Sequence, residues 1–377
     1  MLNIQQLSYW ERKTFFEEID FLIVGAGIVG YSTAIHLRKR YPAAKILIVE
    51  RGYLPSGASS KNAGFACFGS STELLDDLKS ISENKVWETV EKRWQGLNYL
   101  SELIGKENMN FQQLGSWDLI SNNQIEKQTQ CGEKLDYLNE KIRQITGEKF
   151  VYSEDNSINE KFGFAGLCTS FYNRLEGQID TGKMIRKYYQ LAIENNIDVL
   201  FGIEVKSFEC QANEVLVNCE IGEIKTKKML ICTNGFASEL IEEDVQPARA
   251  QVLVTKPIPN LKVKGTFHYD CGYFYFRNID QRILLGGGRN LDFKGETNSQ
   301  LTTTSTIMNA LESLLHNIIL PNQKVEIDYR WAGIMGVGAT KEPIIKKIGE
   351  HIGIGVRMGG MGVAIGSLVG KELAEKF

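Results

Sequence analysis

The sequence lacks the features of a secreted, membrane-spanning or nucleic-acid-binding protein. Its seven cysteines are odd in number and include no C-x-x-C pair, which argues against a disulfide framework or a structural zinc site. No apolar stretch approaches the roughly 18 residues of a membrane helix, so we expect any membrane contact to be peripheral. The formal net charge of −3 offers no basic surface for nucleic acid. Since the amino terminus also lacks the order of a signal peptide, we expect a cytoplasmic protein. From the cysteine pattern we expect no bound metal ion.

What the chain does contain is enough apolar sequence for more than one folded unit. Of its 377 residues, 43% are hydrophobic and 24% are charged, as in an ordinary globular protein. A chain of this length commonly forms two domains with separate cores. The local patterns support such a division, because glycine turns after apolar strands occur near both ends of the chain, whereas alternating strands occur between residues 248 and 292.

The most informative motif lies between Asp20 and Gly30. It begins with an apolar run, Phe21–Val24, that is typical of a parallel strand buried on both faces. A helical pattern begins at Ile28, so the turn before it, which includes Ala26, presents backbone N–H groups at the positive end of a helix. The glycines of this turn have G-x-G-x-x-G spacing and are Gly25, Gly27 and Gly30. The pattern predicts a site for a pyrophosphate group.

The next predicted strand places a carboxylate beside this turn. Residues 45–49 are mostly apolar and are followed by Glu50 and Arg51. In dinucleotide-binding folds an acidic residue about twenty residues beyond the glycines accepts hydrogen bonds from ribose hydroxyls. It would also repel a 2′-phosphate, so the sequence predicts a dinucleotide other than NADP.

Three further turns lie where predicted strands end. The loop Ser56–Gly64 is rich in small residues and either spaces two elements or lets the backbone approach a ligand; its place after a parallel strand favours a ligand. Thr233–Gly235 ends the strand at 228–232. Met358–Gly362 joins the apolar strand Ile352–Val356 to a last helix, where N–H groups and a helix dipole form a second anion site. Two such sites predict a long ligand held at both ends.

A different pattern occupies the segment Tyr273–Arg277. Period-two alternation places Tyr273, Tyr275 and Arg277 on one face of a strand and two phenylalanines on the other. Two phenols and a guanidinium can bind a carboxylate, because arginine offers a bidentate fork and tyrosine a hydroxyl donor. The alternative is an ordinary solvent-facing sheet surface, and the pattern alone does not decide between them.

Taken together, these segments resemble the FAD-dependent amino-acid oxidase and dehydrogenase family, which includes glycine, sarcosine and D-amino-acid oxidising flavoenzymes. The resemblance runs from end to end of the chain. The segments that carry it are Gly25–Gly30, Glu50, Gly57–Gly64, Cys232–Gly235, Trp331–Gly333 and Gly359–Val363. The Gly-Ala-Ser-x-x-Asn-x-Gly form of the second segment and the lead-in Ser8–Trp10 are most similar to the γ-glutamylputrescine oxidoreductase branch.

The resemblance implies that the long ligand is FAD. The glycine turn and Glu50 would hold the ADP half, and Val205 would contact adenine through its backbone. Ser59, Asn62 and Gly64 would meet the pyrophosphate and the flavin. Amides at the start of the last helix would face flavin N1 and O2, where reduced flavin carries negative charge. The full set of expected cofactor residues is Gly25, Ala26, Gly27, Ile28, Gly30, Glu50, Arg51, Ser59, Asn62, Ala63, Gly64, Val205, Thr233, Gly235, Gly333, Gly360, Met361, Gly362 and Val363.

The same resemblance implies where a substrate binds. Arg277 lies in a segment similar to the family strand that bears the arginine for the substrate carboxylate. The expected substrate contacts are Arg277, Tyr275, Tyr273 and Trp331. The chain departs from many relatives in having Ile334 and Met335 where they have an arginine after the Trp-Ala-Gly motif, which leaves open an amine substrate without an α-carboxylate.

Cys67 and His268 lie near these segments, but the expected reaction needs neither of them. A small buried cysteine commonly serves packing, and the four histidines are scattered along the chain. We therefore expect Cys67 to be a buried packing residue and His268 to be a structural or surface residue.

The patterns and the resemblance together predict an α/β fold. A Rossmann-like FAD-binding domain would comprise residues 1-75, 177-247 and 330-377. A second, substrate domain with an antiparallel sheet plus helices would comprise residues 76-176 and 248-329. The expected reaction is oxidation of the C–N bond of an amino acid or amine by hydride transfer to flavin N5, with oxygen or a quinone or other carrier as the electron acceptor.

Two alternatives remain open from the sequence. One is oxidation of an alcohol carbon, in a 2-hydroxy acid or a glycerol phosphate, for which Arg249, Arg289 and Arg357 are candidate additional cations. The other is a non-catalytic FAD-binding protein.

Overall fold

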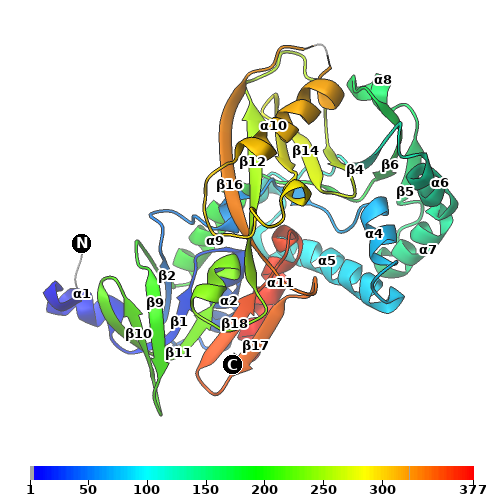
Figure 1. Cartoon of the computed structure of the whole chain (residues 1–377). Helices are drawn as coiled ribbons and strands as arrows, with labels where there is room; N and C mark the ends of the chain where they lie inside the picture. Colours follow the sequence, from blue (N-terminus) through cyan, green and yellow to red (C-terminus); the bar gives the residue numbers. More distant parts are fainter. Residues whose placement is uncertain (1–3, 322) are drawn as a thin grey trace.

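The computed structural model describes residues 4–321 and 323–377, which form two eight-stranded sheets and the helices that cover them (Figure 1). Figure 1 shows the first sheet beside the carboxyl end of the chain and the second sheet at the opposite end of the molecule. The arrangement confirms the predicted α/β fold with one Rossmann-like sheet and one antiparallel sheet.

The first sheet is mainly parallel, with the strand of the glycine motif near its centre. β1 (Ile19–Val24) lies between β2 and β11 and runs parallel to both. All five residues of β2 are buried, as an unbroken apolar run predicts. The order across the sheet is β17 (Ile344–Ile348), β18 (Ile352–Val356), β11 (Gly222–Ile231), β1, β2 (Ile46–Glu50) and β8 (Asp198–Phe201), and β10 (Val215–Cys219) and β9 (Val205–Cys210) continue from β11.

Helices cover one face of this sheet, and a hairpin covers the other. The helices are α2 (Ile28–Arg40), α9 (Thr181–Glu194) and α11 (Gly362–Ala374), with the end of α5 (Glu83–Ile104) against α11. On the opposite face, the buried valines of β10 pack against residues of β1 and β2 that alternate with those under the helices. The first sheet therefore has a hydrophobic core on each face. The carboxyl ends of its parallel strands remain uncovered.

The second sheet is antiparallel except for one pair, β13 and β4, which run parallel. Its order is β16 (Ile327–Val337), β12 (Gln246–Thr255), β15 (Arg282–Gly287), β14 (Phe274–Ile279), β13 (Thr266–Tyr269), β4 (Ser116–Ser121), β6 (Leu167–Asn173) and β5 (Tyr152–Asp155). Stacked rings of Phe267 and Phe276, 4.7 Å apart, form its core together with α10 (Ser305–Leu314) and α8 (Ile158–Phe162). A separate cluster joins the first half of α5 to α4 (Ser71–Asp77), α6 (Ile125–Glu133) and α7 (Leu135–Thr146).

Short elements complete the chain. A two-stranded sheet pairs β3 (Phe65–Ala66) with β7 (Gly177–Gln178), and two short helices are α1 (Tyr9–Glu11) and α3 (Ala58–Lys61). Turns of 3₁₀ or π helix lie at Ile4–Gln6, Arg12–Phe16, Glu107–Met109, Asn234–Glu239, Arg289–Leu291 and Leu315–Ile319. Within the described part of the chain, no helix has the length and apolar character needed to cross a bilayer.

Three of the predicted domain boundaries fall inside elements, since those at residues 75, 247 and 330 lie within α4, β12 and β16. The boundary at residue 330 falls within β16, which pairs along its length with β12 of the second sheet, so the chain returns to the first sheet after Val337. The boundary at residue 75 falls within α4, whose leucines pack with the first half of α5. The division into two domains stays a prediction.

Candidate functional site

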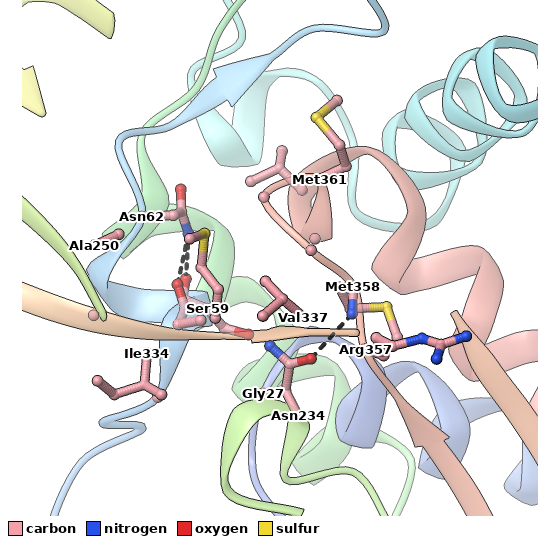
Figure 2. Close-up of a pocket in the computed structure, with 18 of the residues that line it drawn as sticks. Gly27, Ser59, Asn62, Asn234, Ala250, Ile334, Val337, Arg357, Met358 and Met361 are labelled. Carbon is pink, nitrogen blue, oxygen red and sulfur yellow. Dashed lines mark hydrogen bonds between the residues drawn. The ribbon is translucent and has the colours of Figure 1, made fainter. Parts of the chain in front are cut away.

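A cavity of about 1000 Å³ extends from the carboxyl ends of β1 and β2 to the face of the second sheet (Figure 2). One end is lined by Gly25, Glu50 and Val205, and the other by Tyr275 and Ala250. The cavity thus joins the predicted dinucleotide motif to the predicted substrate surface.

The glycine turn at the first end has the close approaches that its spacing predicts. Gly25 has a φ of +107°, which favours glycine. A Cβ on Gly30 would overlap the carbonyl oxygen of Gly25, so only glycine lets α2 lie this close to β1. A Cβ on Gly27 would lie 2.8 Å from Ser59 Oγ, which accepts a hydrogen bond of 3.0 Å from the amide of Ile28. The amino terminus of α2 faces the cavity, since Gly27, Ile28 and Val29 line it, and such a terminus favours a bound anion.

Glu50 is held in place at the wall of the cavity. Its Oε2 accepts a hydrogen bond of 3.1 Å from the amide of Ala26, and its Oε1 accepts from the amide of Gly52 and the hydroxyl of Ser56 at 3.0 and 3.1 Å. The side chain is 8% exposed. A carboxylate has about four lone-pair sites, so these three bonds fix its orientation and leave capacity for a ribose hydroxyl.

Asn62 shapes the loop after α3 (Figure 2). Its amide nitrogen donates to the carbonyls of Ala58 and Ser59 at 3.1 and 2.9 Å. Its Oδ1 accepts from the amide of Gly64 at 2.8 Å and from the hydroxyl of Thr181 at 3.0 Å. The side chain makes four bonds within the protein, so its contribution to the site is to hold the backbone of Ser59 and Gly64 against the cavity.

A second helix terminus closes the other side. The amide of Met358 donates to Asn234 Oδ1 at 3.1 Å, which ties the last glycine turn to the end of β11 (Figure 2). Gly359 then has a φ of +56°, and α11 begins at Gly362. Because the first amides of a helix have no partner within it, the start of α11 presents free donors to the cavity. Thr233 Oγ1, beside this turn, is buried without a hydrogen-bond partner in the described residues.

Nearly all of the expected cofactor residues line this cavity. Two do not, Gly30 and Gly235. A Cβ on Gly235 would overlap the carbonyl oxygen of Met335, so each of these glycines permits a close approach of backbone behind the wall. The residues that line it are Gly25, Ala26, Gly27, Ile28, Glu50, Arg51, Ser59, Asn62, Ala63, Gly64, Val205, Thr233, Gly333, Gly360, Met361, Gly362 and Val363.

Tyr273 and Tyr275 line the second end of the cavity, as expected. The ring of Tyr275 lies over Gly286, where a Cβ would be 2.6 Å from it, and meets Phe65 edge to face at 5.5 Å. Burial raises the pKa of Tyr275 to about 12, so its hydroxyl remains a donor at neutral pH.

Arg277 shares the sheet face of Tyr275 but does not line the cavity, in contrast to the expected substrate contact. Its Nη1 donates to the carbonyls of Gly64 and Ile179 at 2.9 and 2.8 Å. The side chain is 4% exposed, and burial lowers its pKa to about 10. The strand alternation was predicted correctly, but the loop at Gly64 covers the guanidinium. In this position Arg277 supports the loop at Gly64, and its expected contact with substrate stays a prediction.

Trp331 also lies outside the cavity lining. Its indole Nε1 donates to the carbonyl of Lys61 at 2.9 Å, and its ring packs on Val252 and Val254 of β12. Because β16 belongs to the second sheet, the tryptophan fastens that sheet to the end of α3. The expected contact of Trp331 with substrate stays a prediction beside this anchoring role.

Arg289 lines the cavity near Tyr273, although no sequence motif predicts a role for it in the expected reaction. It follows the glycines that end β15, and its guanidinium lies 5.0 Å from the ring of Phe293. Burial lowers its pKa, and Nε is buried without a hydrogen-bond partner. Among the residues described, Arg289 has no ion pair. Arg249, by contrast, makes a bidentate contact with Glu296 at 2.8 and 2.7 Å.

A cluster of charges lies at another part of the cavity wall. Lys341 Nζ contacts Glu73 at 3.0 Å and Asp77 at 2.6 Å, and Arg93 contacts Glu73 at 3.2 Å. Burial alone would raise the pKa of Glu73, but Arg93 and Lys341 lower it to about 2. Burial raises the pKa of Asp77. These groups largely neutralise one another, so they do not select the charge of a ligand by themselves.

Comparisons with known proteins agree with this geometry. The sequence model of a family described as "FAD dependent oxidoreductase" matches residues 20–376. The probable oxidoreductase OrdL of Haemophilus influenzae is 20% identical, over 96% of this chain and 83% of that protein. The γ-glutamylputrescine oxidoreductase of Escherichia coli is 19% identical, over 94% and 83% respectively. A glycine oxidase structure from Bacillus cereus superimposes with a TM-score of 0.75 at 17% identity, over 95% of this chain and 94% of that one.

Proposed function

Because the chain belongs to the family of FAD-dependent oxidoreductases, we propose that it oxidises the C–N bond of an amino acid or another amine that bears a carboxylate. Two of the relatives described above are named for amine or amino-acid substrates, which supports this class of substrate. The observation that carries the proposal is Arg289, a cation without an ion pair among the described residues, in the cavity wall near Tyr273.

The residues of the cavity fit FAD. In our proposal the start of α2 and Ser59 hold the pyrophosphate, Glu50 holds the ribose, and the start of α11 lies against the flavin. The free amides of these two helices match the anionic groups of the cofactor, and Thr233 supplies a further unpaired hydroxyl. When bound, FAD supplies the acceptor for the hydride that leaves the carbon bearing the amine.

The protein's own part in the reaction is to bind and orient the substrate. Arg289 would hold the carboxylate through its planar fork, and Tyr275 would donate its hydroxyl to the same group. The hydroxyl can donate because a tyrosine is protonated at neutral pH, and burial, which raises the pKa of Tyr275 to about 12, extends this to more alkaline pH. Fixing the carboxylate at the sheet face would orient the carbon to be oxidised, which is the contribution that positioning makes to catalysis.

The alternatives are less well supported by the cavity. A phosphate or dicarboxylate substrate needs several free cations, but Arg249 is paired with Glu296 and Arg357 with Asp244. The carboxylate of a 2-hydroxy acid would contact the same Arg289. Oxidation of a hydroxy acid releases no ammonia or amine, so the product distinguishes the two reactions.

The test is to identify what the protein releases. Purified protein with bound FAD is incubated with carboxylate-bearing amines and with the matching hydroxy acids, in the presence of oxygen or an artificial electron acceptor. The proposal predicts release of ammonia or a smaller amine together with a carbonyl product. Carbonyl product from the hydroxy acids alone would refute C–N oxidation, and turnover of neither class would favour a non-catalytic FAD-binding protein.

A further inference from the structure

Three potential metal ligands meet beside the cavity. Cys67 follows β3, Glu176 precedes β7, and His268 lies in β13. Each offers one ligand atom, and these atoms all lie within 4.8 Å of one another. Cys67 is 4% exposed and Glu176 is fully buried. The cluster therefore lies inside the protein and not on an acidic surface.

Two of these side chains have buried atoms that lack a partner. Glu176 Oε1 accepts hydrogen bonds of 2.7 and 2.9 Å from the amides of Phe68 and Gly69, which fixes the carboxylate. Its Oε2 and the Nε2 of His268 are buried and have no hydrogen-bond partner in the part of the chain that the structure describes. Buried polar atoms are nearly always paired, and an unpaired carboxylate oxygen is costly. A bound group between these atoms would account for both.

We propose that Cys67, Glu176 and His268 form a zinc site in the wall of the cavity. A thiolate, an imidazole and a carboxylate are the ligand types that zinc uses in proteins. On binding, the thiol of Cys67 loses its proton to solvent. One thiolate and one carboxylate then balance the two charges of Zn²⁺, which suits a buried position.

The surroundings match a site with an open position. Three protein ligands leave the fourth place of a tetrahedron for water or a substrate group. Cys67 and His268 both line the cavity, so the open position lies on that side. The two backbone amides on Glu176 act as the outer bonds that orient a ligand. Since the ligands come from three distant segments, this zinc site could not have been predicted from the spacing of cysteines or histidines in the sequence.

The test measures zinc in the FAD-bound protein, purified without a polyhistidine tag. The protein is loaded with zinc, passed through gel filtration and analysed by mass spectrometry of the elements. We expect one zinc ion per chain in the wild type. We expect the amount of bound zinc per chain to be at least about tenfold lower in Cys67→Ser and in Glu176→Gln. Cys131→Ser is the matched control, because Cys131 is a free thiol that is 1% exposed outside the cluster.

Flavin content and melting temperature show whether each variant is folded. If Cys67→Ser does not fold, Glu176→Gln still tests the proposal, because the amide oxygen of glutamine can accept the hydrogen bonds from the amides of Phe68 and Gly69. Wild-type protein that carries no zinc after loading would overturn the site. Equal zinc in the wild type and in a folded Glu176→Gln or Cys67→Ser variant would overturn it as well. Neither result depends on which substrate the enzyme oxidises.

Discussion

Arg289 is the residue on which our choice of substrate depends. Replacing it by methionine keeps most of the side-chain length but removes the charge. We expect Arg289→Met to raise the KM for carboxylate-bearing amines by about 10- to 100-fold, since a hydrogen bond to a charged group contributes about 1.5 to 3 kcal/mol. The KM for an amine without a carboxylate should change little. Steady-state kinetics on both substrate types measure the difference.

The control for this variant is Arg330→Met, since Arg330 is exposed in β16 and pairs with Glu312 outside the cavity. It should leave both KM values unchanged. An Arg289→Met enzyme with wild-type preference for carboxylates would remove Arg289 from the substrate site.

Arg277 should behave differently, because it supports the loop at Gly64. Arg277→Met removes two hydrogen bonds to buried carbonyls, and each unpaired group costs about 1 to 3 kcal/mol. We expect a lower melting temperature and weaker FAD binding, measured by flavin release in a thermal scan. The ratio of KM values for carboxylate-bearing and plain amines should remain that of the wild type. A selective loss of carboxylate substrates would instead restore Arg277 as a substrate ligand.

These two arginines show what the sequence could and could not tell at the scale of single residues. The alternation of Tyr275 and Arg277 with phenylalanines predicted their shared sheet face correctly. Which of them reaches the cavity depends on the loop at Gly64, which lies about two hundred residues away in the chain and is held there by long-range contacts. Arg289 follows a run of glycines without any strand pattern, so its inward position could not be predicted from periodicity.

At the scale of elements, the junction of β1 and α2 carries the sharpest prediction. A Cβ on Gly30 would overlap the carbonyl of Gly25, which cannot move without displacing the glycine turn. We expect Gly30→Ala to destabilise the fold by about 1 to 3 kcal/mol, as for overpacking, and to reduce bound FAD. Urea unfolding and the flavin-to-protein absorbance ratio measure the two effects.

Gly132→Ala is the matched control for that change. Gly132 lies in α6, and a Cβ there meets no atom within 4 Å. Alanine should therefore leave FAD binding unchanged and should not destabilise the protein, since it is the better helix former. A Gly30→Ala protein as stable and as yellow as Gly132→Ala would contradict the close approach.

Elements were predictable where a local pattern alone determined them. The strand Ile352–Val356 and the glycine turn and helix after it were expected and are found as β18 and α11. β16 was expected to begin the return to the first sheet at residue 330, yet it pairs with β12 along its whole length. Strand pairing depends on partners far away in the chain, and a continuous apolar stretch does not reveal which sheet it joins.

At the scale of the whole molecule, the network of Glu73, Arg93 and Lys341 joins α4 and α5 to the loop between β16 and β17. The pKa of Glu73 is lowered to about 2 in the folded state. Its stabilising effect is therefore complete above its ordinary pKa near 4.5 and is lost as the pH falls toward about 2. Across this pH window, the free energy of unfolding of the wild type should fall by up to about 3 kcal/mol relative to that of Glu73→Gln.

Urea unfolding of both proteins at neutral and at acidic pH measures this loss. The gap between their free energies of unfolding should narrow as the pH falls. Asp77, whose pKa is raised by burial, is present in both proteins and acts in the opposite direction. A gap that stays constant with pH would show that Glu73 is not held ionised by its neighbours.

The overall organisation could be predicted because the cofactor half of the cavity contains two local motifs. The glycine turn before α2 and the one before α11 are each recognisable from a short segment, and the fold brings them together at the edge of one sheet. The residues that line the second end come from β12, β13, β14 and the turn after β15, which meet only through the topology of the second sheet. The cofactor half of the site was therefore more predictable than the substrate half.

The most direct test of the account is an absorbance spectrum of the purified protein, recorded without oxygen, as carboxylate-bearing amines and hydroxy acids are added in turn. FAD changes colour when it accepts a hydride. We predict that the absorbance band of oxidised flavin at about 450 nm disappears with at least one amine and persists with the matching hydroxy acid. A band that bleaches with hydroxy acids alone, or with no compound of either class, would contradict C–N oxidation as the function of this site.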